Sequence, residues 1–434
     1  MTSGLPARRA AVTALTFVLT SRTALDTALI QAPDFAGLDP RDRAFARLVS
    51  ATTLRRRGQI GAVMNKLMQR PLPDAALPAR LILETAVAQL VFLGTKPHAA
   101  VSGAVDLAKS RRDTDRFSGL INAVLRKVVT QGKAVADATP LAANLPAWLR
   151  ESWLRAYGAE TLEGIAAAAV NPPPLDLTLR DPDTAGDWAE KLGMEILPTG
   201  TLRKREIGDI TALTGFEEGH WWAQDAGAAI PARLLGARKG ETVLDLCAAP
   251  GGKTMQLAST GADVTALDAS PKRMKKVEEN LERTGLKASC VTDDGQVWGE
   301  DGSFDAILLD APCSATGTLR RRPDAAWIKN AEDVQSLQPI QNALFRNATR
   351  LLKPGGRLVI CTCSLQPEEG ERWLESGLRR QESLVVDPIR PEEMPGLEAA
   401  ILENGSVRLT PALWPERGGI DGFFIARLKK SGGS

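Results

Sequence analysis

The sequence predicts a multidomain protein with an all-α N-terminal domain, a small α+β segment, and an α/β domain with a Rossmann-like, doubly wound parallel sheet. The 434 residues are more than one hydrophobic core usually holds. Residues 1–130 show helical periodicity without strand-type alternation. From about residue 220, short apolar runs alternate with helical segments, which is typical of a parallel sheet. We expect domains at 1–135, 146–219 and 220–434.

The first third is expected to be helical because Ala, Leu and Arg dominate it. An apolar stretch after Arg8 and Arg9 resembles an export signal. No small-residue cleavage site follows it and its helical periodicity continues, so we predict a first helix instead. Residues 131–145 are polar and Ala-rich and are expected to form a linker. Pro, Gly and polar breaks separate expected helices near 6–30, 41–57, 59–68, 77–93, 97–109 and 116–131.

Charge is unevenly distributed along the chain. Residues 1–145 carry 20 Lys and Arg against 10 Asp and Glu, a net charge of +10, whereas the remainder carries 34 against 42, a net charge of −8. A basic first third favours a polyanionic partner, and a solvated basic helical surface is the alternative. No apolar run is long enough to span a membrane, so no membrane partner is expected.

The five cysteines all lie in the second half of the chain. Their odd number argues against a disulfide framework and favours the reducing cytoplasm. Cys361 and Cys363 form a lone pair at C-x-C spacing. His98 and His220 are distant in sequence, so no metal site is expected.

The middle of the chain is expected to begin with a helix near Trp148, Trp153 and Tyr157. We expect their aromatic rings to belong to a hydrophobic core. The run 171–174 (NPPP) ends helical structure, and 175–180 (LDLTLR) alternates like a strand. A small α+β segment is expected to about residue 215. Beyond it we expect strands near 242–247, 263–268, 288–292, 304–310, 356–362, 382–386 and 423–428, with helices at 253–259, 271–284, 333–352 and 367–379.

The stretch 243–254 (VLDLCAAPGGKT) predicts a strand, a turn and a helix that together bind a ligand. Its two glycines let backbone approach a ligand closely, and the following helix presents free N–H groups. A P-loop needs glycine where this chain has Cys247, and no G-x-G-x-x-G is present. The ligand is therefore expected to be neither a triphosphate nor a nicotinamide cofactor.

Acidic residues follow the next two expected strands. Asp268 ends the second strand, where a carboxylate can accept hydrogen bonds from ribose hydroxyls. Asp293 and Asp294 follow the third strand, where one of them could face an adenine amino group. Each could equally be a helix cap or a loop residue. An adenosine ligand without a phosphate-binding loop suggests S-adenosylmethionine.

Two thiols follow two later strands. The run 304–310 (FDAILLD) leads into Pro312 and Cys313, and 357–361 leads into Cys363. If these strands are neighbours, they lie about 4.8 Å apart. A single buried cysteine is usually inert, whereas two thiols beside Asp310 at one sheet edge favour a chemical role.

Three motifs carry a resemblance to a known family: LDLCAAPGGKT, DAPCSATGT with the following RRPD (321–324), and TCSLQPEEGE. They resemble the motifs of the RNA cytosine-5 methyltransferases, and the closing DGFFIA (421–426) is similar to that family's last strand. The helical first third resembles the NusB-type RNA-binding domain. Together they resemble the RsmB-like (Fmu/Sun) group of bacterial 16S rRNA methyltransferases. Cys361 departs from the pattern and is given no catalytic role.

The resemblance implies S-adenosylmethionine as cofactor, small-subunit rRNA as substrate, and a cytoplasmic monomer. It implies that Cys363 is the nucleophile and that Cys313 helps to release the product. Asp310 would hold the cytosine edge, and Lys253 would hold or polarise the base. The implied cofactor-binding residues are Cys247, Ala248, Ala249, Pro250, Gly251, Gly252, Lys253, Asp268, Arg273, Asp293, Asp294 and Asp310.

Chemistry gives an independent reason for such a set. Carbon 5 of cytosine is a poor nucleophile until a thiolate adds to carbon 6, so the site needs a thiolate, a donor at the N3 edge and a base. Asp310 could be that donor if burial kept it protonated, and the base must leave its stack. One alternative is a DNA cytosine-5 methyltransferase with Cys313 as nucleophile. Another is a non-catalytic RNA-binding or ribosome-assembly factor.

Overall fold

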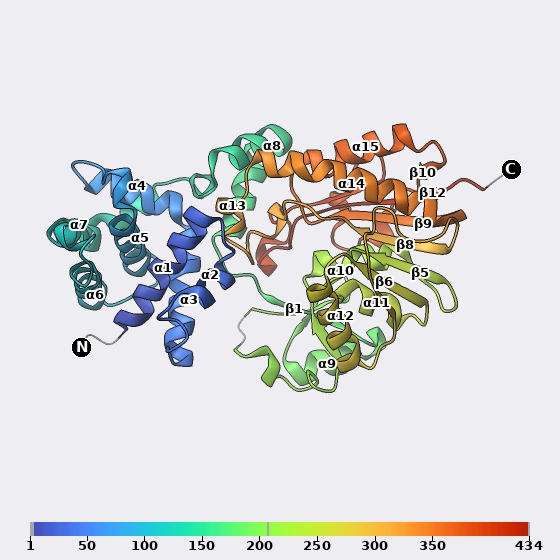
Figure 1. Ribbon diagram of the computed structural model, residues 1–434, viewed down its shortest axis with the longest axis horizontal. Helices are drawn as coiled ribbons and strands as arrows, with labels where there is room; N and C mark the ends of the chain where they lie inside the picture. Colours follow the sequence, from blue (N-terminus) through green and yellow to red (C-terminus); the bar gives the residue numbers. More distant parts are fainter. Residues whose placement is uncertain (1–3, 206–207, 433–434) are drawn as a thin grey trace. The chain divides into compact units, whose positions relative to one another are not determined.

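The computed structural model describes residues 4–205 and 208–432. The chain divides into two compact units, each described here by itself (Figure 1). The helical unit comprises Met1–Pro172 together with Leu319–Asn330, and the sheet unit comprises Pro173–Thr318 and Ala331–Ser434. No helix among the described residues has the length and apolar character needed to cross a membrane.

The helical unit begins with the helices that the sequence predicts. The expected helix 6–30 is two helices, because Arg22 adopts a left-handed conformation with φ 52°. The expected linker 131–145 is wrong in its first half, since α7 continues to Asp137. Ala-rich faces let these helices pack closely, and α5 is buried along most of its length. The helices are α1 (Leu5–Ser21), α2 (Leu25–Gln31), α3 (Pro40–Arg55), α4 (Arg57–Leu67), α5 (Leu77–Val91), α6 (Pro97–Lys109), α7 (Ser118–Asp137) and α8 (Ala147–Ala169).

A segment from far along the chain, Leu319–Asn330, belongs to the helical unit. Its short helix α13 (Ala325–Ile328) carries Trp327, whose indole N–H donates to the Leu54 carbonyl at 3.1 Å. The Asp324 carboxylate accepts from the backbone N–H of Leu25 at 3.2 Å. The RRPD motif that follows Cys313 in sequence is therefore anchored among the first helices.

The sheet unit opens with a small antiparallel sheet in the order β2-β3-β1-β4. The expected α+β segment thus ends at Ala223, a little beyond residue 215. A buried ion pair between Arg203 and Asp176, at 2.6 Å, joins β3 to β1. The elements are β1 (Leu175–Leu179), α9 (Ala185–Leu192), β2 (Glu195–Ile196), β3 (Leu202–Lys204) and β4 (Trp221–Ala223).

The larger sheet has the order β10-β12-β9-β8-β5-β6-β7, with β11 paired to β12. The strands from β9 to β7 in that order are parallel, as expected, but β12 pairs antiparallel with β9, β10 and β11. The sheet is therefore mixed, and the expectation of a wholly parallel sheet is wrong at this edge. The strands are β5 (Thr242–Leu246), β6 (Asp263–Asp268), β7 (Ser289–Thr292), β8 (Phe304–Asp310), β9 (Leu352–Thr362), β10 (Leu384–Val386), β11 (Val407–Leu409) and β12 (Phe423–Lys430).

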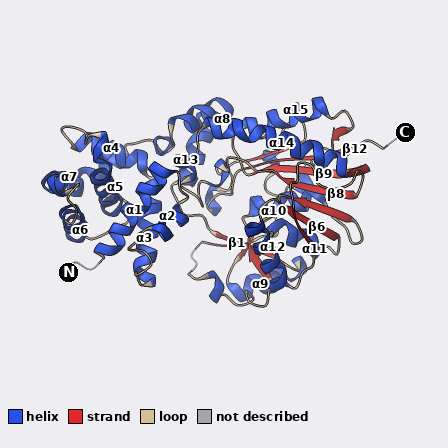
Figure 2. Cartoon of the chain, viewed as in Figure 1, coloured by secondary structure: helices blue, strands red, loops and turns tan. Residues whose placement is uncertain are grey.

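Helices cover both faces of this sheet (Figure 2). Alternate strand residues contribute to two separate cores, as the two-residue period of a strand requires. One core includes residues of α10 (Ala226–Leu235) and α11 (Gly252–Ser259), and the other includes residues of α14 (Ala331–Leu351) and α15 (Glu371–Arg380). Strands buried on both faces explain the nearly continuous apolar runs in the sequence.

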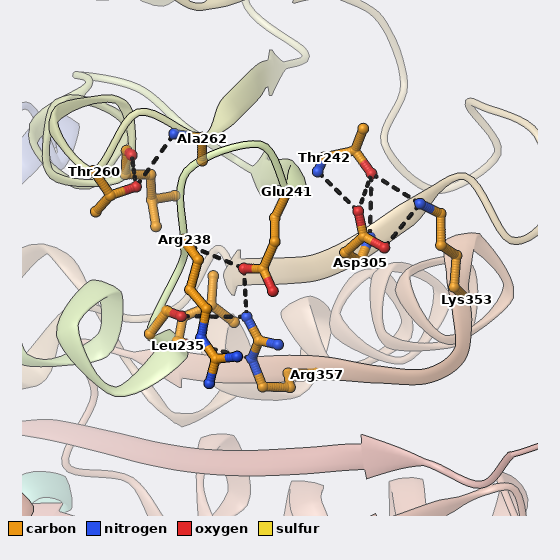
Figure 3. Close-up of polar contacts among 11 residues, drawn as sticks. Leu235, Arg238, Glu241, Thr242, Thr260, Ala262, Asp305, Lys353 and Arg357 are labelled. Atoms are coloured by element: carbon orange, nitrogen blue, oxygen red, sulfur yellow. Dashed lines mark hydrogen bonds and ion pairs between the residues drawn. The ribbon is translucent and has the colours of Figure 1, made fainter.

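Polar contacts fix the amino ends of three central strands (Figure 3). Asp305 of β8 accepts from the Thr242 backbone N–H at 2.9 Å and from Lys353 at 2.8 Å. The Lys353 ammonium, with the bonds from Thr242, lowers the pKa of Asp305 to about 2. Glu241 pairs with Arg357 of β9 at 2.7 Å. These contacts hold β5, β8 and β9 in register, so their carboxyl ends meet at one edge.

Candidate active site

The carboxyl ends of the parallel strands carry the residues that the sequence singled out. β5 lies between β6 and β8, at the point where the strand order reverses and open α/β sheets bind ligands. The register of β8 and β9 places Asp310 opposite Cys361. The two strands that precede Cys313 and Cys363 are thus neighbours, as expected.

The loop after β5 folds against the end of β6. The backbone N–H groups of Cys247 and Ala248 both donate to the Leu267 carbonyl, at 2.8 and 3.0 Å. Gly251, at φ 102°, occupies a backbone conformation that favours glycine and precedes the first residue of α11. The loop from Cys247 to Gly252 is therefore held at the mouth of the sheet.

Asp268 is buried at the end of β6, with 3% exposure. One of its oxygens accepts from the Ala249 N–H at 3.2 Å, and the other accepts from the Ser270 N–H at 3.0 Å. Arg273 lies 3.4 Å from the same carboxylate and donates to the Ala249 carbonyl at 2.6 Å. Asp268 and Arg273 together tie the loop to β6.

A cavity of about 170 Å³ opens beside these residues. Asp294 lines it and Asp293 does not, which separates two residues that the sequence left as alternatives. Apolar walls suit an adenine ring, and carboxylates suit its amino group and the ribose hydroxyls, so the lining fits an adenosine cofactor. The lining residues are Leu246, Cys247, Leu267, Asp268, Ala269, Arg273, Asp294, Gly295, Gln296, Asp310, Pro312, Ile340 and Leu344.

Sequence reasoning missed Asp245, which lies beneath the loop. Its side chain is fully buried and accepts from the Thr254 hydroxyl at 2.6 Å, while its Oδ1 has no partner among the described residues. Burial raises the pKa of Asp245 to about 7. The available signal was a charged residue inside the apolar run VLDL.

Lys253, in the first turn of α11, forms an ion pair with Asp310 at the end of β8. Nζ lies 2.7 Å from Oδ2, and the ammonium is 5.4 Å from the centre of the Phe423 ring. Burial alone would lower the pKa of Lys253, but Asp310 and the nearby Cys361 and Asp245 outweigh it and raise that pKa. The ion pair places an ammonium donor directly beside Asp310. Lys253 is the group that can donate.

The two thiols meet at the ends of β8 and β9. Cys313 Sγ lies 3.5 Å from Cys363 Sγ. The hydrogen bond to Cys363 and then burial raise the pKa of Cys313 well above its ordinary value. Either sulfur is placed to donate a hydrogen bond to the other. Cys361 is buried with Sγ 3.5 Å from Asp310 Oδ1, and burial raises its pKa as well.

Close backbone contacts fix the loops that carry the thiols. The Gly317 N–H donates to the Cys363 carbonyl at 2.9 Å, and the Gly422 N–H donates to the Gly317 carbonyl at 2.9 Å. A Cβ on Gly317 would lie 2.1 Å from the Gly422 oxygen, so only glycine fits. Within the described residues, no cluster of three His, Cys, Asp or Glu side chains could hold a metal ion.

Comparisons with known proteins show the family of this chain. A model of the 16S rRNA methyltransferase RsmB/F family matches residues 232–429, and a NusB family model matches residues 5–130. Ribosomal RNA small subunit methyltransferase B of Salmonella arizonae is 34% identical over 405 residues, which cover 90% of this chain and 91% of that protein.

Solved structures share the fold. PH0851 is 23% identical, with a TM-score of 0.74 over 98% of this chain and 99% of its own. A methyltransferase homolog from Pyrococcus horikoshii is 28% identical, with a TM-score of 0.54 over 65% of this chain and 94% of its own. The fold and site define an S-adenosylmethionine-dependent methyltransferase. Within that class, the chain belongs to the RsmB/F family of 16S rRNA methyltransferases and has a NusB domain at its N-terminus.

Proposed function

We propose that this protein transfers a methyl group to carbon 5 of a cytidine in 16S rRNA through a covalent adduct with Cys363. The observation that carries the proposal is the pair of thiols 3.5 Å apart at the ends of adjacent strands. A second thiol beside a nucleophilic one suits a reaction in which an enzyme–substrate bond forms and must later break.

The chemistry divides into three steps at the base. The Cys363 thiolate adds to carbon 6, and the electron pair moves onto the ring toward N3 and the carbonyl oxygen. The cofactor supplies an electrophilic methyl group, and carbon 5 of the resulting enamine takes it. Carbon 5 then loses its proton to a base, and the bond between sulfur and carbon 6 breaks to return the Cys363 thiolate. Cys313 assists this release.

Lys253, oriented by Asp310, stabilises the negative charge that develops on the cytosine ring. The Lys253 ammonium is buried, so a hydrogen bond from it to the base edge is stronger than in water. Asp310 orients that ammonium through the 2.7 Å ion pair and can accept from the cytosine amino group. Cys247, Ala248, Ala249, Pro250, Gly251, Gly252, Asp268, Arg273 and Asp294 hold the cofactor, with Asp294 rather than Asp293 facing the adenine.

The basic helical unit is proposed to bind the rRNA. The +10 net charge of residues 1–145 supports this role, because cationic side chains bind phosphates and release counterions. Residues 1–135 would then bind RNA, residues 146–219 would connect, and residues 220–434 would transfer the methyl group, although α8 of the connecting region lies within the helical unit.

The test is methyl transfer to deproteinised total RNA from cells that lack this gene, with nucleoside mass spectrometry as the readout. We expect 5-methylcytidine to appear in 16S rRNA with the natural protein and not with Cys363→Ala. A methylated base other than 5-methylcytidine, or equal activity of Cys363→Ala, would contradict the proposal. Activity on DNA would favour the alternative in which Cys313 is the nucleophile.

A further inference from the structure

Glu369 is a buried carboxylate next to the Cys313 loop, and its side chain is 0% exposed. It ends the turn Pro367–Glu369 that follows β9, whereas the Cys313 loop follows β8. Its oxygens lie 2.9 and 3.2 Å from the backbone nitrogen of Ser314, which donates to them, and the Ser314 hydroxyl donates to the same carboxylate. The Gln341 side chain of α14 donates to it at 3.2 Å.

All of these partners of the Glu369 side chain are uncharged. In the described part of the chain, N–H and O–H donors satisfy Glu369, and no lysine or arginine pairs with it. Its neighbour Glu371, in contrast, pairs with Arg408 at 2.7 Å. These hydrogen bonds fix the position and orientation of the Glu369 side chain against the Cys313 loop.

Glu369 contacts both thiol loops with different groups: its backbone carbonyl accepts from the Thr362 hydroxyl at 2.8 Å, next to Cys363, whereas its carboxylate accepts from Ser314, next to Cys313. Ser314 follows Cys313 in sequence, so the hydrogen bonds to Glu369 fix the backbone on which Cys313 stands. The Cys363 carbonyl is held separately, by the Gly317 N–H. The hydrogen bond between Cys313 and Cys363 and the burial of Cys313 raise the pKa of Cys313, and the negative charge of Glu369 adds to them.

We propose that Glu369 is a positioning residue that decides which of the two thiols becomes the nucleophile. It holds the Cys313 loop against Cys363 and disfavours a second negative charge on Cys313, so that Cys363 carries the thiolate. This inference rests on the proposed function for the meaning of the two thiols. Glu369 acts through Ser314 and through its charge.

Site-resolved alkylation of the full-length protein tests this proposal without RNA or cofactor. Iodoacetamide is applied across a pH series, and mass spectrometry follows the peptides that contain Cys313 and Cys363. A single neighbouring charge shifts a pKa by about one unit or more. We therefore expect Glu369→Gln to raise the rate of Cys313 alkylation, relative to Cys363, about tenfold below neutral pH.

The matched control is Glu368→Gln, since Glu368 pairs with Arg372 and makes no described contact with the Cys313 loop. This control should alkylate like the natural protein. The Glu369→Gln side chain has a local partner, because the buried Gln341 Oε1 has none among the described residues and can accept from the new amide. An unchanged ratio of Cys313 to Cys363 alkylation in folded Glu369→Gln would overturn the proposal.

Glu369→Asp distinguishes the effect of the carboxylate charge from the effect of the side-chain length. It also tests the proposal if Glu369→Gln does not fold. The shorter side chain keeps the charge but loosens the hydrogen bonds to Ser314. We expect its alkylation ratio to stay near that of the natural protein while the release of methylated RNA slows about tenfold or more. Natural release kinetics in this variant would contradict the positioning role. If the protein methylates another nucleotide, the proposed function fails, whereas the alkylation result still reports on Glu369.

Discussion

Lys253 Nζ lies 2.7 Å from Asp310 Oδ2, and this ion pair joins α11 to the strand that leads to Cys313. The ammonium is therefore a proton donor beside Asp310, where the cytosine edge is proposed to bind. Its pKa is raised by Asp310 despite burial, so Lys253 stays charged throughout the neutral range.

Replacing Lys253 tests that role. Lys253→Met keeps most of the side-chain volume and should bind the cofactor nearly as well, while single-turnover methyl transfer falls about 10²–10⁴-fold. Lys253→Arg should retain part of the rate, since it keeps the charge with a different geometry. A natural single-turnover rate in Lys253→Met would mean that another group donates to the base.

The cofactor assignments can be tested by replacing three carboxylates, two of which are adjacent in sequence. Asp268→Ala and Asp294→Ala should each weaken S-adenosylmethionine binding about tenfold or more, because hydrogen bonds to charged groups contribute about 1.5–3 kcal/mol. Asp293→Ala is the control, since Asp293 does not line the cavity. Isothermal calorimetry measures all three. Weaker binding only in Asp293→Ala would reverse the assignment.

Asp245 gives a stability prediction with a definite pH range. Burial raises its pKa to about 7 in the folded state, above the ordinary value near 4. The contribution of protonated Asp245 to the free energy of unfolding is therefore fully present below about pH 4. It is lost as pH rises through about 7, and the loss amounts to at most about 4 kcal/mol.

Asp245→Asn removes this titration while keeping an acceptor for Thr254. Calorimetric melting curves should show that the variant gains stability relative to the natural protein between about pH 4 and pH 7, with a constant difference above pH 8. A difference between the two proteins that does not change with pH would show that Asp245 does not titrate in this range.

The RNA-binding role of the helical unit is best tested by substitution rather than by truncation. Removing residues 1–145 would also expose Trp327, whose indole donates to Leu54. Arg41 and Arg112 are exposed and have no described side-chain partner. Arg41→Gln and Arg112→Gln should each reduce the salt dependence of rRNA binding by about one unit of log–log slope for each phosphate that the arginine neutralises.

The matched controls for these two variants are Arg41→Lys and Arg112→Lys, which keep the charge. Filter binding at several salt concentrations gives the slopes. Identical slopes for the Gln variants, the Lys variants and the natural protein would mean that these two arginines do not bind rRNA phosphates.

The sequence was sufficient for features that depend on local pattern. Helical periodicity located α3 to α6, and apolar runs located β5 to β9. The expected strand ends placed Asp268 and Asp310 at the ends of β6 and β8, and Cys363 directly after β9. These predictions succeeded because parallel strands place their carboxyl ends at one edge.

Features that depend on packing between distant segments were not predictable in the same way. Glu369 lies in the acidic run PEEGE, which looks like a solvated turn, and only tertiary packing shows that it is buried against Ser314. The anchoring of Trp327 in the helical unit and the antiparallel pairing of β12 likewise depend on long-range interactions. The ion pair between Asp310 and Lys253 also needed the structure, because the two residues are far apart in sequence.

The most direct test of the proposed mechanism is the RNA–protein adduct that survives denaturing electrophoresis, compared among three variants. We expect Cys313→Ala to accumulate the adduct, because Cys363 still adds to carbon 6 while release is slow. Cys363→Ala and the double variant should form none. An adduct that accumulates in Cys363→Ala and is absent in Cys313→Ala would contradict the assignment and make Cys313 the nucleophile.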